Sequence, residues 1–271
     1  MRTVAPIAPD AQALAEAGGI TVIEDRSAKC ELCGEWSDGT RAELAAWARS
    51  HIRTVHDAAR PSVLGLDLSL TRAGIAVSSL DPQREAFCPS LLTHVGESGS
   101  QDATWDERCD RLVRQLKAVV GYIDAAIRVG ADIRLGVIEG PSYGHAHMPG
   151  YYDRAGLWWP VYAALRSRRI PVATVTPDHR GKFICGVKPP PSDRGKRLVL
   201  DETRARWSTP RTTEIMNNPM RFIANHDQAD ALGLCEMGVL GAKWAVPWQV
   251  RRRHVENVAL VTWPTVRGLD D

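Results

Sequence analysis

Four acidic residues stand where the surrounding sequence is apolar or has the pattern of a buried helix. Asp67 closes the run VLGLD, and Glu139 closes the run LGVIE. Asp227 and Asp230 open the stretch HDQADALGLCEMGVLG, which is otherwise mostly apolar. An isolated carboxylate among core residues costs free energy unless it is paired or binds a metal. These four side chains are therefore the first candidates for chemistry.

The spacing of the four carboxylates predicts a metal site. Residues three positions apart lie on the same side of a helix, so Asp227 and Asp230 point together. If the strands that end at Asp67 and Glu139 are neighbours, both carboxylates reach the same edge of a sheet. Gathered carboxylates repel one another, and all-oxygen ligands select Mg²⁺ or Mn²⁺. Taken alone, the helical pair is better explained by capping and the helix dipole, but the four together favour a metal.

A second group of residues has the spacing of a zinc site. Cys30 and Cys33 form a C-x2-C turn, and His51 and His56 follow in a stretch that predicts a helix over 42–55. Two thiolates and two imidazoles are ligands of a tetrahedral structural Zn²⁺. Seventeen residues separate Cys33 from His51, where two-Cys, two-His fingers have about twelve. We expect one bound Zn²⁺, and the sequence leaves open whether this module contacts DNA or only stabilises the N-terminus.

An α/β fold is expected to position these groups. Apolar runs bounded by turn residues predict strands over 62–68, 73–80, 86–95, 133–140 and 170–177. Helical spacing predicts helices over 103–130, 151–169, 194–207 and 225–241. Short turns between the first three strands predict an antiparallel meander, and the order of elements predicts a mixed five-stranded sheet with helices on its faces.

Composition narrows the class of protein. A hydrophobic fraction of 44% and a charged fraction of 24% are ordinary for a globular domain, and no apolar run is long enough to span a membrane. The N-terminus lacks the pattern of a secretory signal, which favours a cytoplasmic protein. The net charge of +2 neither demands nor excludes nucleic acid. Local basic clusters, such as Arg194 to Arg197, could bind phosphates or be solvated faces.

Four segments, in this order, resemble the RuvC-type Holliday junction resolvases of the RNase H-like superfamily: GLDLSLTRAGIAV, GVIEGPSYG, VTPDHRGKFICGVKPPPSDRGKRLVL and HDQADALGL. The resemblance implies a homodimer that nicks two opposing strands of a four-way DNA junction symmetrically. It also implies that two Mg²⁺ (or Mn²⁺) ions are held by Asp67, Glu139, Asp227 and Asp230. Such ions activate water and stabilise the leaving oxygen in phosphodiester cleavage. A bacterial or viral origin is implied as well.

Basic residues are expected between the fifth strand and the last helix, as in the resembled family. Lys182 and Lys196 are the candidates for a catalytic role at the scissile phosphate, and the sequence does not decide between them. Further DNA contacts are expected from Tyr143, Lys188, Arg194 and Arg197. A flat side chain such as that of Tyr143 could wedge between bases at a branch point.

The resemblance and the composition together predict four parts: an N-terminal arm (1–24), a zinc-finger-like module (25–58), an RNase H-like nuclease domain (60–245) and an irregular C-terminal tail (246–271). The zinc module is not part of the common family pattern.

Three other functions are alternatives to junction resolution. The sequence does not distinguish a four-way junction resolvase from a nuclease of the same fold that prefers flaps or forks. GLDLSLTRAGIAV also resembles the first phosphate loop of actin-like ATPases, but those proteins need two such domains and a second phosphate loop, which the sequence lacks. A non-catalytic DNA-binding protein is disfavoured because all four carboxylates are present.

Overall fold

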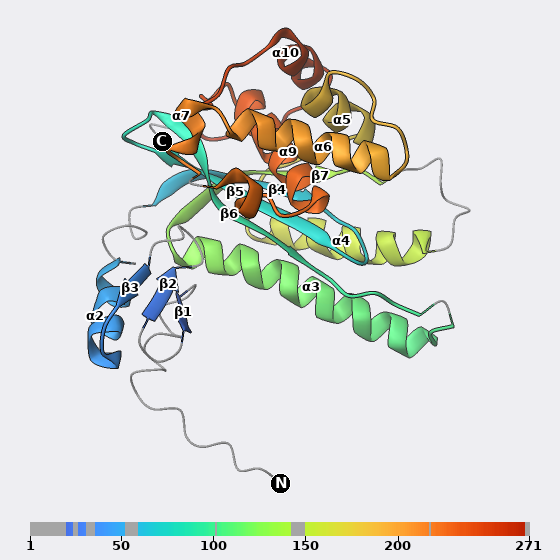
Figure 1. Cartoon of the computed structure of the whole chain (residues 1–271). Helices are drawn as coiled ribbons and strands as arrows, with labels where there is room; N and C mark the ends of the chain where they lie inside the picture. The colour runs from blue at the N-terminus through green and yellow to red at the C-terminus, as the bar shows by residue number, and fades with distance from the viewer. Residues whose placement is uncertain are drawn as a thin grey trace. The chain divides into compact units, whose positions relative to one another are not determined.

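A computed structural model describes residues 20–23, 27–30, 36–51, 59–100, 102–141, 150–216 and 218–268 (Figure 1). The chain divides into two compact units. One comprises residues 1–60 and 123–132, and the other comprises residues 61–122 and 133–271. The described part of the expected C-terminal tail, residues 246–268, is grouped with the larger of these units.

A mixed five-stranded sheet is the centre of the larger unit, with the strand order β6-β5-β4-β7-β8. Its strands are β4 (Arg60–Asp67), β5 (Ala73–Asp81), β6 (Ala86–Val95), β7 (Ala131–Glu139) and β8 (Val172–Val175). Strands β4, β5 and β6 pair as an antiparallel meander, and β7 pairs with β8 in parallel. The predicted α/β class, with a mixed five-stranded sheet, is confirmed.

Helices cover both faces of this sheet. They are α3 (Trp105–Arg128), α4 (Tyr151–Ser167), α5 (Pro177–Cys185), α6 (Asp193–Trp207), α7 (Pro210–Thr213), α8 (Pro219–Phe222), α9 (His226–Gly241) and α10 (Arg252–Ala259). Figure 1 shows α3 and α4 on one face of the sheet and α5, α6 and α9 on the other. Across the part of the chain that is described, none of the helices has the length and apolar character to cross a membrane.

Among the helices that the sequence does not predict are α5 and α10. The strand expected over 170–177 ends at Val175, and α5 begins at Pro177 directly after it. Thr176 caps α5, because its Oγ1 accepts a hydrogen bond from the His179 amide at 3.2 Å, and Pro at the first position suits a helix start. Helix α10 lies in the segment that the sequence predicts to be irregular. Both helices are short, so their periodicity is weak evidence in the sequence.

Helix α9 lies directly on β4 and β5 because two glycines leave room for its backbone. A Cβ at Gly65 would come within 2.1 Å of the Ala231 carbonyl oxygen, and a Cβ at Gly74 within 2.0 Å of the Asp227 carbonyl oxygen. Every residue of α9 from Asp227 to Val239 is buried. A helix that is buried on all sides belongs to the core of a domain, and here its first turns lie over the end of β4.

The described residues of the smaller unit between Ile20 and His51 form a three-stranded antiparallel sheet and a helix. The strands are β1 (Ile20–Ile23), β2 (Ser27–Cys30) and β3 (Trp36–Asp38), in the order β1-β2-β3, and the helix is α2 (Arg41–His51). Thr40 and Glu43 form a capping box at the start of α2: the Thr40 amide donates to Glu43 Oε2 at 2.8 Å, and the Glu43 amide donates to Thr40 Oγ1 at 3.4 Å.

The predicted zinc ligands fall mainly outside the described residues. Cys33 and His56 are not described, and Cys30 and His51 are placed by their backbone alone, at the ends of β2 and α2. The zinc site therefore stays a prediction.

Candidate functional site

The four predicted carboxylates lie at one edge of the five-stranded sheet. Asp67 and Glu139 are the last residues of β4 and β7, which are neighbours in the sheet. Asp227 and Asp230 occupy the first turns of α9, whose start is capped by Asn225: its Oδ1 accepts from the Gln228 amide at 3.0 Å. The strand ends and the helix start thus bring these side chains toward one place.

An arginine that the sequence analysis did not single out lies among the carboxylates. Arg180 Nη1 is 3.5 Å from Asp67 Oδ1 and forms an ion pair with Glu139 Oε2, while Arg180 Nε is 3.1 Å from Asp230 Oδ1. One guanidinium therefore joins two strand ends and α9. The sequence signal for it is the short segment TPDHR, which follows β8 and begins α5.

Asp227 has a separate set of partners. Arg72, in the turn between β4 and β5, places Nε 3.4 Å from Asp227 Oδ2. His226 Nε2 lies 3.3 Å from Asp227 Oδ1. Four carboxylates thus meet two guanidinium groups, which leaves an excess of negative charge at this edge of the sheet.

Burial of this excess charge shifts the protonation of the site. Burial, opposed by Arg180 and reinforced by the neighbouring carboxylates, raises the pKa of Glu139 to about 8 and that of Asp230 to about 7. Burial also raises the pKa of Asp67. For Arg180, burial disfavours the charged form, but Asp230, Glu139 and Asp67 outweigh it and raise its pKa. The positive charge around these carboxylates is too small to offset the cost of burying their ionised forms.

The donor atoms of this cluster suit a divalent cation. Glu139 Oε2, Asp227 Oδ2 and Asp230 Oδ1 are buried oxygens that face the guanidinium groups of Arg180 or Arg72. Burying several carboxylates together is costly unless enough positive charge surrounds them, and carboxylate oxygens are the ligands that Mg²⁺ and Mn²⁺ prefer. In the part of the chain that is described, no three His, Cys, Asp or Glu side chains converge as a formed metal site. Arg180 lies among the carboxylate oxygens that would have to converge on a bound cation.

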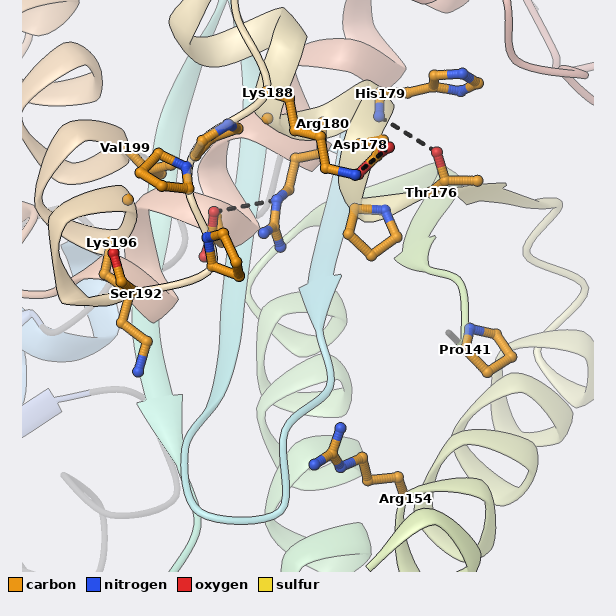
Figure 2. Close-up of a pocket in the computed structure, with 17 residues that line it drawn as sticks. Pro141, Arg154, Thr176, Asp178, His179, Arg180, Lys188, Ser192, Lys196 and Val199 are labelled. Atoms are coloured by element: carbon orange, nitrogen blue, oxygen red, sulfur yellow. Dashed lines mark hydrogen bonds and ion pairs between the residues drawn. The ribbon is translucent and has the colours of Figure 1, made fainter. Parts of the chain in front are cut away.

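A cavity of about 940 Å³ lies beside the carboxylates, and Asp230 is among its lining residues. Its basic lining residues are Arg154, Arg180, Lys188 and Lys196. Figure 2 shows Arg154, from α4, facing Arg180 across the cavity, with Lys196 on one side and Pro141 on the other. Lys188 Nζ binds Asp178 Oδ2 at 2.9 Å. Positive charge exceeds negative charge on this wall, which favours phosphate groups.

The segment KPPPS closes one side of the cavity. A Cβ at Gly181 would come within 2.4 Å of Pro189 Cδ, and a Cβ at Gly195 would come within 1.9 Å of the Pro190 carbonyl oxygen. The proline segment therefore packs on α5 and α6 only because both helices carry glycine at the contact.

The predicted DNA-binding residues separate into three groups. Lys196 and Lys188 line the cavity, and Lys196 lies close enough to Asp230 to lower its pKa against the dominant effect of burial. Lys182, Arg194 and Arg197 are exposed on α5 and α6 and do not line this cavity. Tyr143 lies outside the described residues. The structure thus brings Lys196, rather than Lys182, to the carboxylates.

Comparison with known proteins finds similarity at the level of solved structures. No protein-family model and no curated protein matches the chain. The chain is similar to T. thermophilus RuvC in complex with a Holliday junction substrate, with 14% identity over 67% of this chain and 94% of that chain and a TM-score of 0.45. It is similar to the yeast mitochondrial Holliday junction resolvase Ydc2, with 14% identity, coverage of 85% and 92%, and a TM-score of 0.41.

A third similar structure is the fowlpox virus resolvase in complex with substrate Holliday junction DNA, with 11% identity, coverage of 65% of this chain and 94% of that chain, and a TM-score of 0.38. At these values the likeness assigns no activity to this chain.

Proposed function

We propose that this protein is a divalent-metal-dependent DNA endonuclease that resolves four-way junctions by paired symmetric nicks. The observation that carries the proposal is the meeting of Asp67, Glu139 and Asp230 around Arg180, at the rim of a cavity with a basic wall. The resemblance of the sequence segments around these residues to RuvC-type resolvases supports the four-way junction as the substrate.

The residues of the site have distinct proposed roles. Asp67, Glu139, Asp227 and Asp230 would hold two Mg²⁺ (or Mn²⁺) ions, which when bound supply an activated water and stabilise the leaving oxygen. Lys196, Lys188 and Arg154 would bind the phosphates that enter the cavity, because fixed cations stabilise the charge that develops on non-bridging oxygens. They lie on α4, α6 and the KPPPS segment, so they would contact an entering DNA strand from several sides.

Symmetric cleavage of a four-way junction needs two active sites, and one chain supplies one. We therefore expect a homodimer in which each copy cuts one of two opposing strands. The zinc-finger-like module, with Cys30, Cys33, His51 and His56 as ligands, would hold one structural Zn²⁺ outside the nuclease site.

A panel of labelled substrates tests the proposal. Four-way junctions, forks, flaps and linear duplex are incubated with Mg²⁺, and the nicks are mapped. We expect paired symmetric nicks in the four-way junction. Preferential cutting of forks or flaps would instead favour the alternative nuclease specificity.

Two single variants connect the cleavage to the site. Asp67→Asn is expected to abolish cleavage and to retain junction binding, because it removes the charge of one carboxylate of the cluster. Asp201→Asn makes the same chemical change at an exposed position of α6 and is expected to retain cleavage. Full cleavage by Asp67→Asn would contradict the assignment of the site.

A further inference from the structure

Arg180 carries a permanent positive charge in a place built from carboxylates. Its side chain is 13% exposed and lies within ion-pair range of Asp67, Glu139 and Asp230. An arginine cannot lose its charge under ordinary conditions. The guanidinium therefore offsets the repulsion of these carboxylates for as long as it stays among them.

The contacts of Arg180 differ from those of the structural arginines of this chain. Arg108 binds Asp153 through two hydrogen bonds, of 3.0 and 2.6 Å, and Arg206 Nη2 binds Glu236 Oε2 at 2.7 Å. In contrast, Arg180 divides its contacts: Nε faces Asp230, and Nη1 faces both Asp67 and Glu139. Paired, aligned hydrogen bonds are what lock an arginine onto a carboxylate. Arg180 is shared among three carboxylates instead of being paired with one.

Arg180 also borders open space. It lines the cavity of about 940 Å³, so its side chain has room to leave the carboxylates without disturbing the core. Lys188 and Lys196 line the same cavity, so a phosphate group bound there would meet the displaced guanidinium among other cations.

We infer that Arg180 is an exchangeable internal counterion. It holds the carboxylates together in the absence of a divalent cation, and it moves into the cavity to bind a substrate phosphate when a cation takes its place. This inference rests on the proposed function, because it takes the same carboxylates to be the cation ligands. It follows that Arg180 competes with the cation, and that a bound phosphate strengthens cation binding by stabilising the displaced side chain.

Mn²⁺ binding to the full chain without DNA tests the competition. Free Mn²⁺ is measured by electron paramagnetic resonance for the wild type, Arg180→Gln, Arg180→Lys and Arg154→Gln. Arg180→Gln is expected to bind Mn²⁺ roughly tenfold more tightly than the wild type, in the range typical of coupling between sites. Arg180→Lys keeps the charge and is expected to stay near the wild type. Arg154→Gln removes the same charge from the cavity wall and is expected to change the affinity far less.

Each outcome of this titration has a distinct meaning. Equal or weaker binding by Arg180→Gln would overturn the inference and leave the proposed function standing. No saturable binding by any of the four proteins would overturn both.

A measurement on the wild type keeps the inference testable if a variant does not fold. Arginine modification by phenylglyoxal is mapped by mass spectrometry with EDTA and with Mg²⁺. Arg180 is expected to be protected in EDTA and modified in Mg²⁺, whereas the buried Arg206 is expected to be protected in both. Unchanged protection of Arg180 would overturn the inference.

Discussion

Gly74 and Asp227 touch through their backbones: a Cβ on Gly74 would lie 2.0 Å from the Asp227 carbonyl oxygen. Gly74 is also the strand partner of Asp67 in the β4–β5 ladder. One glycine thus sets the distance between the end of β4 and the first turn of α9. The separation between the carboxylates of Asp67 and Asp227 depends on that distance.

Gly74→Ala is expected to lower stability and cleavage together. The added methyl group cannot fit unless α9 shifts, and overpacking of this kind costs about 1–3 kcal/mol. Urea unfolding measures the first effect, and Mg²⁺-dependent cleavage of a four-way junction measures the second. Gly121→Ala in α3 is the control, because a Cβ there meets nothing within 4 Å. A Gly74→Ala protein with the stability and cleavage rate of the wild type would contradict this account.

Arg253→Ala is expected to loosen the helix that carries Arg180. Helix α10 packs on α5, and Arg253 Nη2 donates to the Ile184 carbonyl at 2.9 Å and to Glu202 Oε2 at 3.2 Å. Loss of these charge-assisted hydrogen bonds should lower the free energy of unfolding by about 1.5–3 kcal/mol.

The matched control is Arg252→Ala on the same helix. Arg252 is exposed and pairs only with Glu256 in the described chain, at 2.6 Å. An exposed pair contributes about 0.5 kcal/mol or less. Equal effects of the two substitutions on unfolding by urea would show that Arg253 does not hold α5.

Acid is expected to destabilise the larger unit through His254. Burial, with Arg206, Arg253 and Arg251 nearby, lowers the pKa of His254 to about 3 from its ordinary value of 6.5. Its Nδ1 accepts from the Arg251 amide at 2.9 Å, and its ring lies 4.9 Å from those of Phe183 and Trp248. The neutral ring is favoured in the folded state, so its contribution is complete above pH 6.5 and is lost as the pH falls toward 3.

The difference between the wild type and His254→Gln isolates this effect. Other groups titrate in the same range, but they are common to both proteins. The free energy of unfolding of the wild type should fall more steeply, by up to about 1.4 kcal/mol per pH unit below pH 6.5. Urea unfolding at pH 7, 6, 5 and 4 measures it, and parallel curves for the two proteins would refute the prediction.

Purified protein is expected to contain about one Zn²⁺ per chain by elemental analysis, since two cysteines and two histidines satisfy a tetrahedral site. Cys33→Ser should lose the metal, whereas Cys109→Ser, at an exposed cysteine of α3, should retain it. Wild-type protein free of zinc that still protects residues 30–56 from hydrogen exchange would rule the site out.

Local pattern was enough to predict the five strands and the main helices. A run such as VLGLD can be buried only as a strand or a helix of the core, and its length and neighbours decide which. The same pattern marked Asp67 and Glu139, because a carboxylate at the end of an apolar run stands out without knowledge of the fold.

The tertiary structure decided what surrounds those carboxylates. Sequence alone placed Asp67, Glu139, Asp227 and Asp230 on their elements, yet the place of Arg180 depends on β8 lying beside β7 and on α5 turning back over the sheet end. Lys182 and Lys196 looked equivalent in the sequence, and only the packing of α5 and α6 turned Lys196 to the cavity. Carboxylates at the ends of apolar runs are a local property of the chain. Which side chain becomes their counterion depends on packing between residues that are distant in sequence and close in space.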